Sequence, residues 1–269
     1  MKYTIGEFSE ILGITVDTLR LYEKRGIIKP IKDKQNNYRY FNDLDARKLL
    51  MSRWYRSFQI SLNDVADLVN NPSLEKITAK IEETQLDLER KIKMNTLLLN
   101  KILEVKKDIT GIDSSLYQLK IKKLPGIYRV KQTNQNILLK NSSLKDVINT
   151  WMNSLPYSFR SFRVEKNAFF EENRLNCTWG LAIFEDEMQY FDLKIDDTTE
   201  YVSAQTYLST VLTTTEEFLS KSSIQFAIDY LKEHNYTVVG DIIGKLIVTE
   251  KVNLQDQTYI ELNIPIYTN

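Results

Sequence analysis

Residues 18–24 read Thr-Leu-Arg-Leu-Tyr-Glu-Lys, and they bring a hydroxyl, two cations and an aromatic ring into two turns of a helix. Guanidinium and ammonium groups can hold phosphates, and short polar side chains near the start of a helix can reach the edges of bases. The spacing therefore predicts a helix that reads double-stranded DNA.

Two short helices and a tight turn must position this stretch. Residues 4–7 have the threonine-then-glutamate spacing of a capping box, so a helix should begin there, with an apolar face of Ile5, Phe8, Ile11 and Leu12. Gly13 breaks that helix, and Thr15 can cap a second one that buries Val16 and Leu19, with Tyr22 either on the same face or at a phosphate. Two helices joined in this way form a helix-turn-helix, whose second helix enters the major groove.

Residues 4–69 resemble the N-terminal domain of the MerR family of transcription regulators. The family's usual run Thr-Leu-Arg-Tyr-Tyr-Glu stands here as residues 18–23, with leucine in place of the first tyrosine, so Leu21 either packs or touches a sugar. Asp17 has two alternative roles, a contact with a base or only a favourable negative charge in the first turn of its helix. The predicted base contacts are Thr15, Val16, Asp17 and Thr18, and the predicted phosphate contacts are Arg20, Tyr22, Lys24 and Arg39.

A hairpin is expected after the reading helix, because Lys29-Pro30 begins an extended segment. The Asn36-Asn37 pair can supply left-handed turn residues, and residues 38–41 would form the returning strand. By resemblance this hairpin is the wing of a winged helix, with asparagine where the family usually has glycine. The tyrosines of the strand share one face, where phosphate contact and packing are equal alternatives. The candidate wing contacts are Asn37, Tyr38 and Arg39.

Two further helices should brace the wing and complete a DNA-binding domain over residues 1–72. One is expected over residues 42–58, with Leu44, Leu49, Leu50 and Trp54 as its apolar residues, and the other begins at Ser61. Arg56, like Arg53, could touch the DNA backbone, although a charged side chain on a helix is more often a solvated face.

Residues 74–109 contain neither glycine nor proline and predict a helix about 50 Å long at 1.5 Å per residue. Polar residues interrupt its heptad repeat at three core positions, where they can fix register and partner number. The pattern favours a two-stranded coiled coil over residues 73–112, the alternative being a helix that lies along its own domain; the resemblance implies an antiparallel homodimer. Two reading heads would then bind a near-palindromic site. The apolar core positions are Ile81, Leu88, Ile92, Leu99, Ile102 and Ile109, and the polar ones are Gln85, Asn95 and Lys106.

Residues 119–269 are rich in β-branched and aromatic residues and predict a third domain, which makes the fold class α+β. Two strand-helix-strand-strand repeats predict an antiparallel sheet with helices on one face and a ligand crevice where the halves meet. The expected order is strand 119–132, helix 143–155, strand 176–184 and strand 188–195, then strand 205–213, helix 222–233, strand 240–248 and strand 258–266.

This half resembles the gyrase-inhibitor-like effector-binding domain of the multidrug-sensing branch of the family. The shared features are Tyr207-Leu208, residues 230–236, Gly240-Asp241 and residues 260–266, in that order. The resemblance implies an aromatic pocket that holds lipophilic cations against a glutamate. The candidate ligand-binding residues are Trp151, Tyr157, Trp179, Phe191, Tyr207, Phe226, Tyr230, Lys245 and Glu261.

The chain departs from that pattern where the pocket glutamate should fall. A few residues after Gly240 it reads Ile243-Gly244-Lys245-Leu246, so a cation would lose its buried partner and meet Lys245 if that side chain points inward. The ligand is then a cation held by a substitute carboxylate, a neutral or anionic compound, or none at all. The possible substitutes are Glu185, Glu250 and Glu261.

Charge and cysteine usage narrow the function further. Lys and Arg number 12 against 9 Asp and Glu in residues 1–72, 8 against 8 in residues 73–118, and 16 against 19 in residues 119–269, which suits a DNA-binding module joined to a domain with another role. Cys177 and His234 are the only cysteine and histidine, so one chain cannot build a Cys/His metal site, and no metal or cofactor is expected. Cys177 lies among apolar residues and should be a buried small hydrophobe.

These patterns together predict a dimeric, cytoplasmic transcription regulator that is not an enzyme. The resemblance implies that it binds promoter DNA with RNA polymerase and, on binding a small hydrophobic or aromatic ligand such as a drug, distorts the promoter spacer. One alternative is a ligand-independent repressor whose C-terminal domain binds a protein. The other is an enzyme, for which the sequence offers no histidine pair, glycine-rich phosphate loop or nucleophile elbow.

Overall fold

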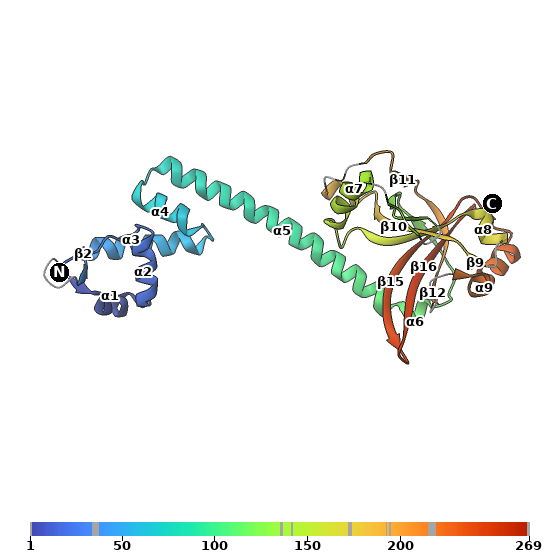
Figure 1. The fold of residues 1–269 in the computed structure, drawn as a ribbon, viewed down its shortest axis with the longest axis horizontal. Helices are drawn as coiled ribbons and strands as arrows, with labels where there is room; N and C mark the ends of the chain where they lie inside the picture. Colours follow the sequence, from blue (N-terminus) through green and yellow to red (C-terminus); the bar gives the residue numbers. More distant parts are fainter. Residues whose placement is uncertain are drawn as a thin grey trace. The chain divides into compact units, whose positions relative to one another are not determined.

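The computed structural model describes residues 2–33, 38–134, 137–140, 142–171, 174–191, 193, 195–214 and 219–267. The chain divides into two compact units, residues 1–96 and residues 97–269 (elements labelled in Figure 1). The division falls within the long helix α5 (Leu74–Thr110), which is continuous over 37 residues. The domain limits expected at residues 72, 112 and 119 stay predictions.

The first unit contains the predicted helix-turn-helix and wing. Its helices are α1 (Ile5–Leu12), α2 (Val16–Lys24), α3 (Asp43–Ser57) and α4 (Leu62–Asn70). Its strands β1 (Tyr3–Thr4), β2 (Ile31–Lys32) and β3 (Arg39–Phe41) pair antiparallel in the order β1-β3-β2. The turn residues Asn36 and Asn37 lie outside the described residues.

Local sequence signals fix the ends of these helices. The Thr4 amide donates to the Glu7 carboxylate at 2.8 Å, and the Thr4 hydroxyl accepts from the Glu7 amide, so the predicted capping box is confirmed. Gly13 ends α1 in the left-handed region at φ 61°, where a residue without a Cβ is favoured. The reading helix α2 therefore starts at a position that its neighbours determine.

The core of this unit confirms one predicted helix face and corrects another. Leu19 and Tyr22 of α2 are buried beside the stacked rings of Phe8 and Phe41, whose centroids are 4.7 Å apart. On α3 only Leu49 of the predicted apolar face is buried; the other three, Leu44, Leu50 and Trp54, are exposed. The buried residues of α3 are Asp45, Leu49, Ser52 and Tyr55, so a different side of the helix faces the core. The sequence-based prediction followed hydrophobicity alone and missed the polar members of this face.

Asp45 explains how a carboxylate belongs to that face. One of its oxygens accepts from the Lys29 amide at 3.2 Å, and the other accepts from the Asn42 amide at 3.2 Å. The side chain thus caps its own helix and fixes the segment that leads into the wing, so its burial is compensated by hydrogen bonds.

The second unit is built on a nine-stranded sheet made from two similar halves. The first half runs β5 (Ile127–Lys131), α7 (Ser142–Met152), β8 (Phe159–Val164) and β10 (Cys177–Phe184). The second runs β12 (Gln205–Thr214), α9 (Lys221–Glu233), β15 (Ile242–Val252) and β16 (Gln255–Tyr267). Their order in the sheet is β5-β10-β8-β15-β16-β12, so the halves meet in mirrored order at the antiparallel pair β8–β15. The two predicted strand-helix-strand-strand repeats are confirmed.

The remaining elements extend or decorate this sheet. Strand β4 (Lys120–Leu124) lies at one edge beside β12, β11 (Thr199–Val202) lies at the other beside β5, and β14 (Thr237–Val238) pairs with β16. Short pairs form between β6 (Thr133–Asn134) and β7 (Ile137–Leu138), and between β9 (Arg174–Leu175) and β13 (Leu219–Ser220). The short helices are α6 (Ile112–Ser115), α8 (Lys166–Glu171) and the 3-10 turn η1 (Met188–Tyr190).

Two of the predicted strands are wrong in detail. The single strand expected over residues 119–132 is divided at Pro125-Gly126 into β4 and β5, which join the sheet in different places. The strand expected over residues 188–195 is absent in its described part, where Met188–Tyr190 form a 3-10 turn. The other strand of the first repeat is instead Phe159–Val164, in which Ser161-Phe162-Arg163-Val164 alternate polar and apolar residues, a signal that the prediction missed.

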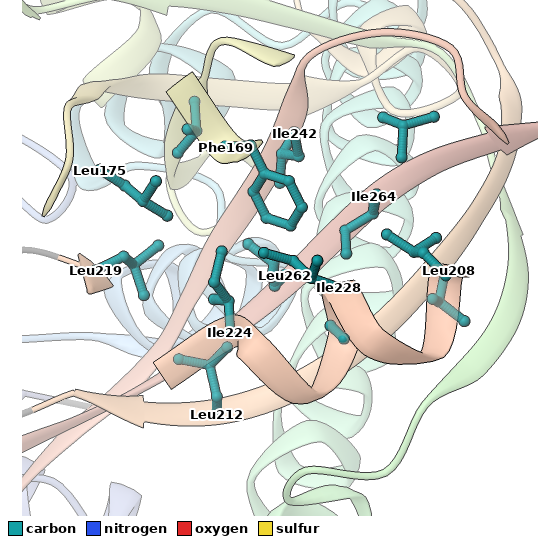
Figure 2. Close-up of a cluster of buried hydrophobic side chains, with 14 of the residues drawn as sticks. Phe169, Leu175, Leu208, Leu212, Leu219, Ile224, Ile228, Ile242, Leu262 and Ile264 are labelled. Carbon is teal, nitrogen blue, oxygen red and sulfur yellow. The ribbon is translucent and has the colours of Figure 1, made fainter. Parts of the chain in front are cut away.

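Both long helices of this unit cover the same face of the sheet. Ile224 and Ile228 of α9 lie among Leu212, Leu262 and Ile264 of the strands (Figure 2). Leu144, Val147 and Trp151 of α7 pack against Leu181 and Ile183, which share a face of β10 with Cys177 of the α9 cluster. The opposite face therefore carries the residues of the other parity, and it is there that polar and charged groups gather.

Candidate nucleic-acid interface and effector site

The start of α2 presents hydroxyl groups at its exposed end. Thr15 caps the helix by accepting from the Thr18 amide at 3.2 Å, and the two hydroxyls lie 2.8 Å apart. Thr15 and Asp17 are exposed, while Val16 and Thr18 are half-buried. These are the four predicted base contacts, and the geometry brings them together at one helix end; their contact with DNA stays a prediction.

Arg20 lies one turn further along α2. Its guanidinium is 3.2 Å from the Asp17 carboxylate, and both side chains are mostly exposed. Exposed ion pairs of this kind contribute about 0–1 kcal/mol, so a phosphate can readily replace the carboxylate. Lys24, the exposed last residue of the same helix, is the next cation along it.

Tyr22 and Arg39, two of the predicted phosphate contacts, both have partners within the fold. Tyr22 belongs to the core of the unit, so packing is its role in the fold, and a phosphate contact through its hydroxyl stays a prediction. Arg39 lies in β3 opposite Lys32, and its Nε donates to both oxygens of Glu23 at 3.0 and 2.8 Å. The guanidinium thus links the wing strand to the reading helix.

The other predicted contacts divide between exposed and structural positions. Tyr38 is exposed, Tyr40 is half-buried, and Asn37 lies outside the described residues. Arg56 donates to the Ile60 carbonyl at 2.6 Å, which ties the end of α3 to the loop before α4. That contact gives Arg56 a structural role, and its predicted DNA contact stays a prediction.

Sequence reasoning missed three cations that extend the same surface. Arg25, Lys29 and Lys32 are exposed and follow α2 into the wing. Arg25 donates to the Asn63 side chain at 2.5 Å, and Asn70 donates to the Gly26 carbonyl at 3.0 Å, so α4 supports this segment. The signal that could have found them was the run of basic residues between the reading helix and the wing.

A helix-turn-helix with a wing and an exposed row of cations beside its second helix defines a DNA-binding protein of the winged-helix class. Residues 4–41 match the family model described as "MerR family regulatory protein". The chain is 32% identical over 110 residues to an uncharacterised HTH-type transcriptional regulator, YyaN, of Bacillus subtilis, covering 40% of this chain and 79% of that protein. The chain belongs to the MerR family of transcription regulators.

Two further relatives have more specific names than YyaN. The ZntR homologue of Haemophilus influenzae is 35% identical over 89 residues, 33% of this chain and 64% of that protein. The multidrug-efflux transporter 2 regulator of Bacillus subtilis is 24% identical over 104 residues, 37% of this chain and 38% of that protein. The chain thus spans less than two thirds of either relative. Among solved structures, an EcmrR–DNA complex matches 99% of this chain and 100% of that chain with a TM-score of 0.39 and 16% identity.

The nine predicted ligand residues fall in different parts of the second unit. Trp151, Tyr157 and Phe191 belong to the cluster beneath α7, whereas Trp179, Phe226 and Tyr230 pack against the cluster beneath α9. Tyr207 is fully buried in β12, where its hydroxyl accepts from the Gln205 amide nitrogen at 3.0 Å. In the described part of the chain, Lys245 and Glu261 share a cleft with a volume of about 20 Å³. That volume holds about one water molecule. The aromatic crevice expected between the halves stays a prediction.

The charged groups of that cleft already have partners. Lys245 Nζ lies 2.8 Å from Asp108 and 4.0 Å from Glu104, both on the last turns of α5. Glu261 of β16 pairs across β12 with Lys122 of the edge strand β4. The other two substitute carboxylates accept hydrogen bonds from tyrosine hydroxyls, Glu185 from Tyr201 at 3.1 Å and Glu250 from Tyr259 at 2.7 Å. Glu261, Glu185 and Glu250 are thus all engaged within the chain.

Gly244 lies close to the position where the family's pocket glutamate was expected. It has a packing role there. A Cβ built on it would lie 1.9 Å from Cζ of the Phe162 ring on the facing strand β8. Phe162 is fully buried and its ring centroid is 5.1 Å from that of Trp179. The glycine therefore lets this ring cross the central strand pair, which explains its presence without a ligand.

A row of alternating charges crosses the sheet face opposite the helices. Arg129 is fully buried and pairs with Glu200 at 2.8 Å; Glu200 also pairs with Arg163 at 3.1 Å, and Arg163 Nε donates to Asp241 at 2.8 Å. Burial lowers the pKa of Arg129, and the nearby Glu200 carboxylate opposes that shift. These four residues, which sequence reasoning missed, tie β5, β11 and β8 to the start of β15.

Other kinds of site are limited by what the described residues contain. Cys177 is buried as expected, and burial raises the pKa of its thiol to about 11. Within the described ranges no group of three His, Cys, Asp or Glu side chains is arranged to hold a metal ion. No helix in those ranges has the length and hydropathy of a membrane-spanning segment.

Proposed function

We propose that this chain is a dimeric transcription regulator that recognises a near-palindromic promoter site, acts with RNA polymerase by distorting the promoter spacer, and responds to a small hydrophobic or aromatic ligand through its C-terminal domain. Membership of the MerR family supports the DNA-binding part. The observation that carries it is the exposed end of α2, where two threonine hydroxyls and Arg20 lie together in a winged helix-turn-helix.

The DNA-binding part is tested by comparing Arg20→Ala with Arg47→Ala. Arg47 is an equally exposed arginine on α3, paired with Asp43 at 3.3 Å and outside the predicted interface. Removing one phosphate contact should lower the slope of log affinity against log salt by about 1. We expect Arg20→Ala to do so in a fluorescence anisotropy titration with duplex DNA, and Arg47→Ala to leave the slope unchanged. Equal slopes in all three proteins would refute the assignment of α2.

The dimer part rests on apolar side chains that a single chain leaves uncovered. All six predicted apolar core positions of the heptad repeat on α5 are exposed. A hollow of about 500 Å³, lined in part by Ile81, Leu88 and Phe58, continues this stripe toward exposed residues of α3. Because the stripe and the hollow share Ile81 and Leu88, a second copy of α5 would cover both.

Sedimentation of two adjacent variants tests the dimer. Leu99→Glu places a charge at a predicted core position, whereas Asn100→Glu places it on an exposed neighbour about 100° around the helix. We expect the wild type and Asn100→Glu to sediment near twice the chain mass of 31.6 kDa, and Leu99→Glu to shift toward 31.6 kDa. Dimers in all three proteins would place the interface elsewhere.

The alternative, a ligand-independent repressor whose C-terminal domain binds a protein, is favoured by one observation. The cleft shared by Lys245 and Glu261 has a volume of about 20 Å³, far below the roughly 300–1,000 Å³ of ordinary ligand sites. Titration of intrinsic tryptophan fluorescence with cationic, neutral and anionic aromatic compounds separates the two functions. Saturable quenching supports the ligand response, and its absence for every compound supports the protein-binding repressor.

A further inference from the structure

Lys101 of α5 is buried to an extent that is unusual for a lysine. Its side chain is 5% exposed, and its ammonium donates to Glu187 at 2.8 Å and to Glu104 at 3.0 Å. Burial alone would lower the pKa of Lys101, but the hydrogen bonds to the two carboxylates raise it, so the side chain is held as a cation. Lysines are almost never buried to this degree unless they are paired.

Glu187, which accepts a hydrogen bond from Lys101, is also unusually buried for a charged residue. Glu187 lies just after β10, its side chain is 17% exposed, and burial raises its pKa despite the neighbouring ammonium. Its second oxygen, Oε2, is buried and has no hydrogen-bond partner among the described residues. Lys101 therefore satisfies only half of this carboxylate.

Two aromatic residues of the hydrophobic cluster beneath α7 carry buried polar groups. Tyr157 is 6% exposed and Trp151 is fully buried, yet neither the Tyr157 hydroxyl nor the Trp151 indole nitrogen finds a partner in the described part of the chain. Glu187 contributes to raising the pKa of Tyr157, after burial itself, which places the phenol near the carboxylate. Phe191 packs on Tyr157 with ring centroids 4.8 Å apart.

We propose that Glu187, together with Tyr157 and Trp151, is a site for an organic ammonium ion, that Lys101 fills this site in the free chain, and that a ligand binds by displacing Lys101. The Lys101 side chain shows the class of ligand: a primary ammonium on an apolar stem, with the carboxylate as counter-charge and rings as walls. A free ligand can also donate to Oε2, which Lys101 leaves without a partner. The proposal deepens the ligand response proposed above and rests on it.

Displacement of Lys101 would be felt along α5. Glu104 lies between the two anchors of this helix, 3.0 Å from Lys101 and 4.0 Å from Lys245, and Asp108 holds Lys245 one turn later. When a ligand takes the Glu187 carboxylate, the anchor between Lys101 and Glu187 is lost, and Lys101 keeps Glu104 of its own helix as its carboxylate partner. The site is therefore connected by charge to the helix that carries the predicted dimer stripe.

The test is calorimetric titration of the full chain with benzylammonium, with benzyl alcohol as the neutral probe of matching shape. A tethered competitor has an effective concentration in the millimolar range, so Lys101→Ala should bind benzylammonium about ten-fold more tightly than the wild type, or more. Glu187→Gln should lose the binding, since it removes the charge and keeps the shape. Lys107→Ala, an exposed lysine on the same helix, is the matched control and should bind as the wild type does.

Three results would overturn the proposal: equal affinity of the wild type and Lys101→Ala, retained binding by Glu187→Gln, or no binding by any variant. If Lys101→Ala does not fold, the comparison of the wild type with Glu187→Gln still tests the site. The wild type must bind benzylammonium, and Glu187→Gln must not. DNA binding is measured separately by anisotropy. A protein that binds DNA as proposed and shows one of these three results contradicts only the ammonium site, whereas failure to bind DNA contradicts the proposed function.

Discussion

Replacement of Gly244 by alanine probes the centre of the C-terminal sheet, where the two repeats meet. The new Cβ would lie 1.9, 2.0 and 2.5 Å from three atoms of the Phe162 ring, distances that no relaxed structure tolerates. The ring cannot easily move, because it is fully buried and packs against Trp179. Overpacking of this kind destabilises a core by about 1–3 kcal/mol, and we expect Gly244→Ala to fall at the upper end of that range.

The matched control is Gly240→Ala, four residues earlier. The nearest atom to its new Cβ is Cγ of Pro265 at 3.7 Å, an ordinary contact, so its effect should stay within about 0.5 kcal/mol. A second variant, Phe162→Leu, makes room for the methyl group. The double variant Gly244→Ala/Phe162→Leu should then be less destabilised than the sum of the single variants by about 0.5–3 kcal/mol.

The assay is urea unfolding followed by tryptophan fluorescence, in which Trp179 reports on the ring it contacts. A fall in the midpoint with an unchanged slope measures lost stability. Equal midpoints for Gly244→Ala and Gly240→Ala, or strictly additive effects in the double variant, would show that the ring does not cross the strand at Gly244. The packing explanation for this glycine would then be wrong.

Three further predictions follow from single contacts. Arg39→Ala and Glu23→Ala should each weaken DNA binding measured by anisotropy, and their effects should be non-additive because Arg39 Nε donates to Glu23; strict additivity would mean that the two act separately. Thr15→Val removes the cap on the Thr18 amide and should lower the free energy of unfolding of the first unit by about 1 kcal/mol in urea titrations; an unchanged midpoint would deny the cap. Burial raises the pKa of Cys177 from 9.0 to about 11, so its contribution to stability is intact below pH 9 and is lost as the pH rises to about 11. A thiol reagent at pH 8 should label Cys177 only after unfolding, and rapid labelling of the folded chain would contradict its burial.

The first unit could be predicted closely because its signals are local. The capping box at Thr4, the left-handed Gly13 and the cap at Thr15 each act within a few residues, so the sequence itself determines where α1 and α2 begin and end. The buried face of α3 was missed because it includes Asp45 and Ser52, whose burial depends on partners elsewhere in the fold. Hydrophobicity alone gave no sign of those partners.

The C-terminal unit shows where reasoning from the sequence reaches its limit. The repeat of strand, helix and two strands was visible, but which strand pairs with which depends on contacts between residues far apart in the chain. The same holds for the candidate site. Aromatic residues at strand spacing suggested one pocket, whereas Trp151 and Trp179 belong to different clusters on one face of the sheet. The fold also brings Lys101 to Glu187 across 86 residues.

The most direct test of the account is selection of bound sequences from a pool of random-sequence DNA duplexes by the full chain, with Arg20→Ala as the comparison. The account predicts that the wild type enriches an inverted repeat of two half-sites, because the proposed dimer joins two copies of α2 through α5. Arg20→Ala should enrich the same repeat more weakly, since Arg20 is assigned to a phosphate and not to a base. Enrichment of a single half-site, or of no sequence at all, would contradict a dimeric, sequence-reading regulator.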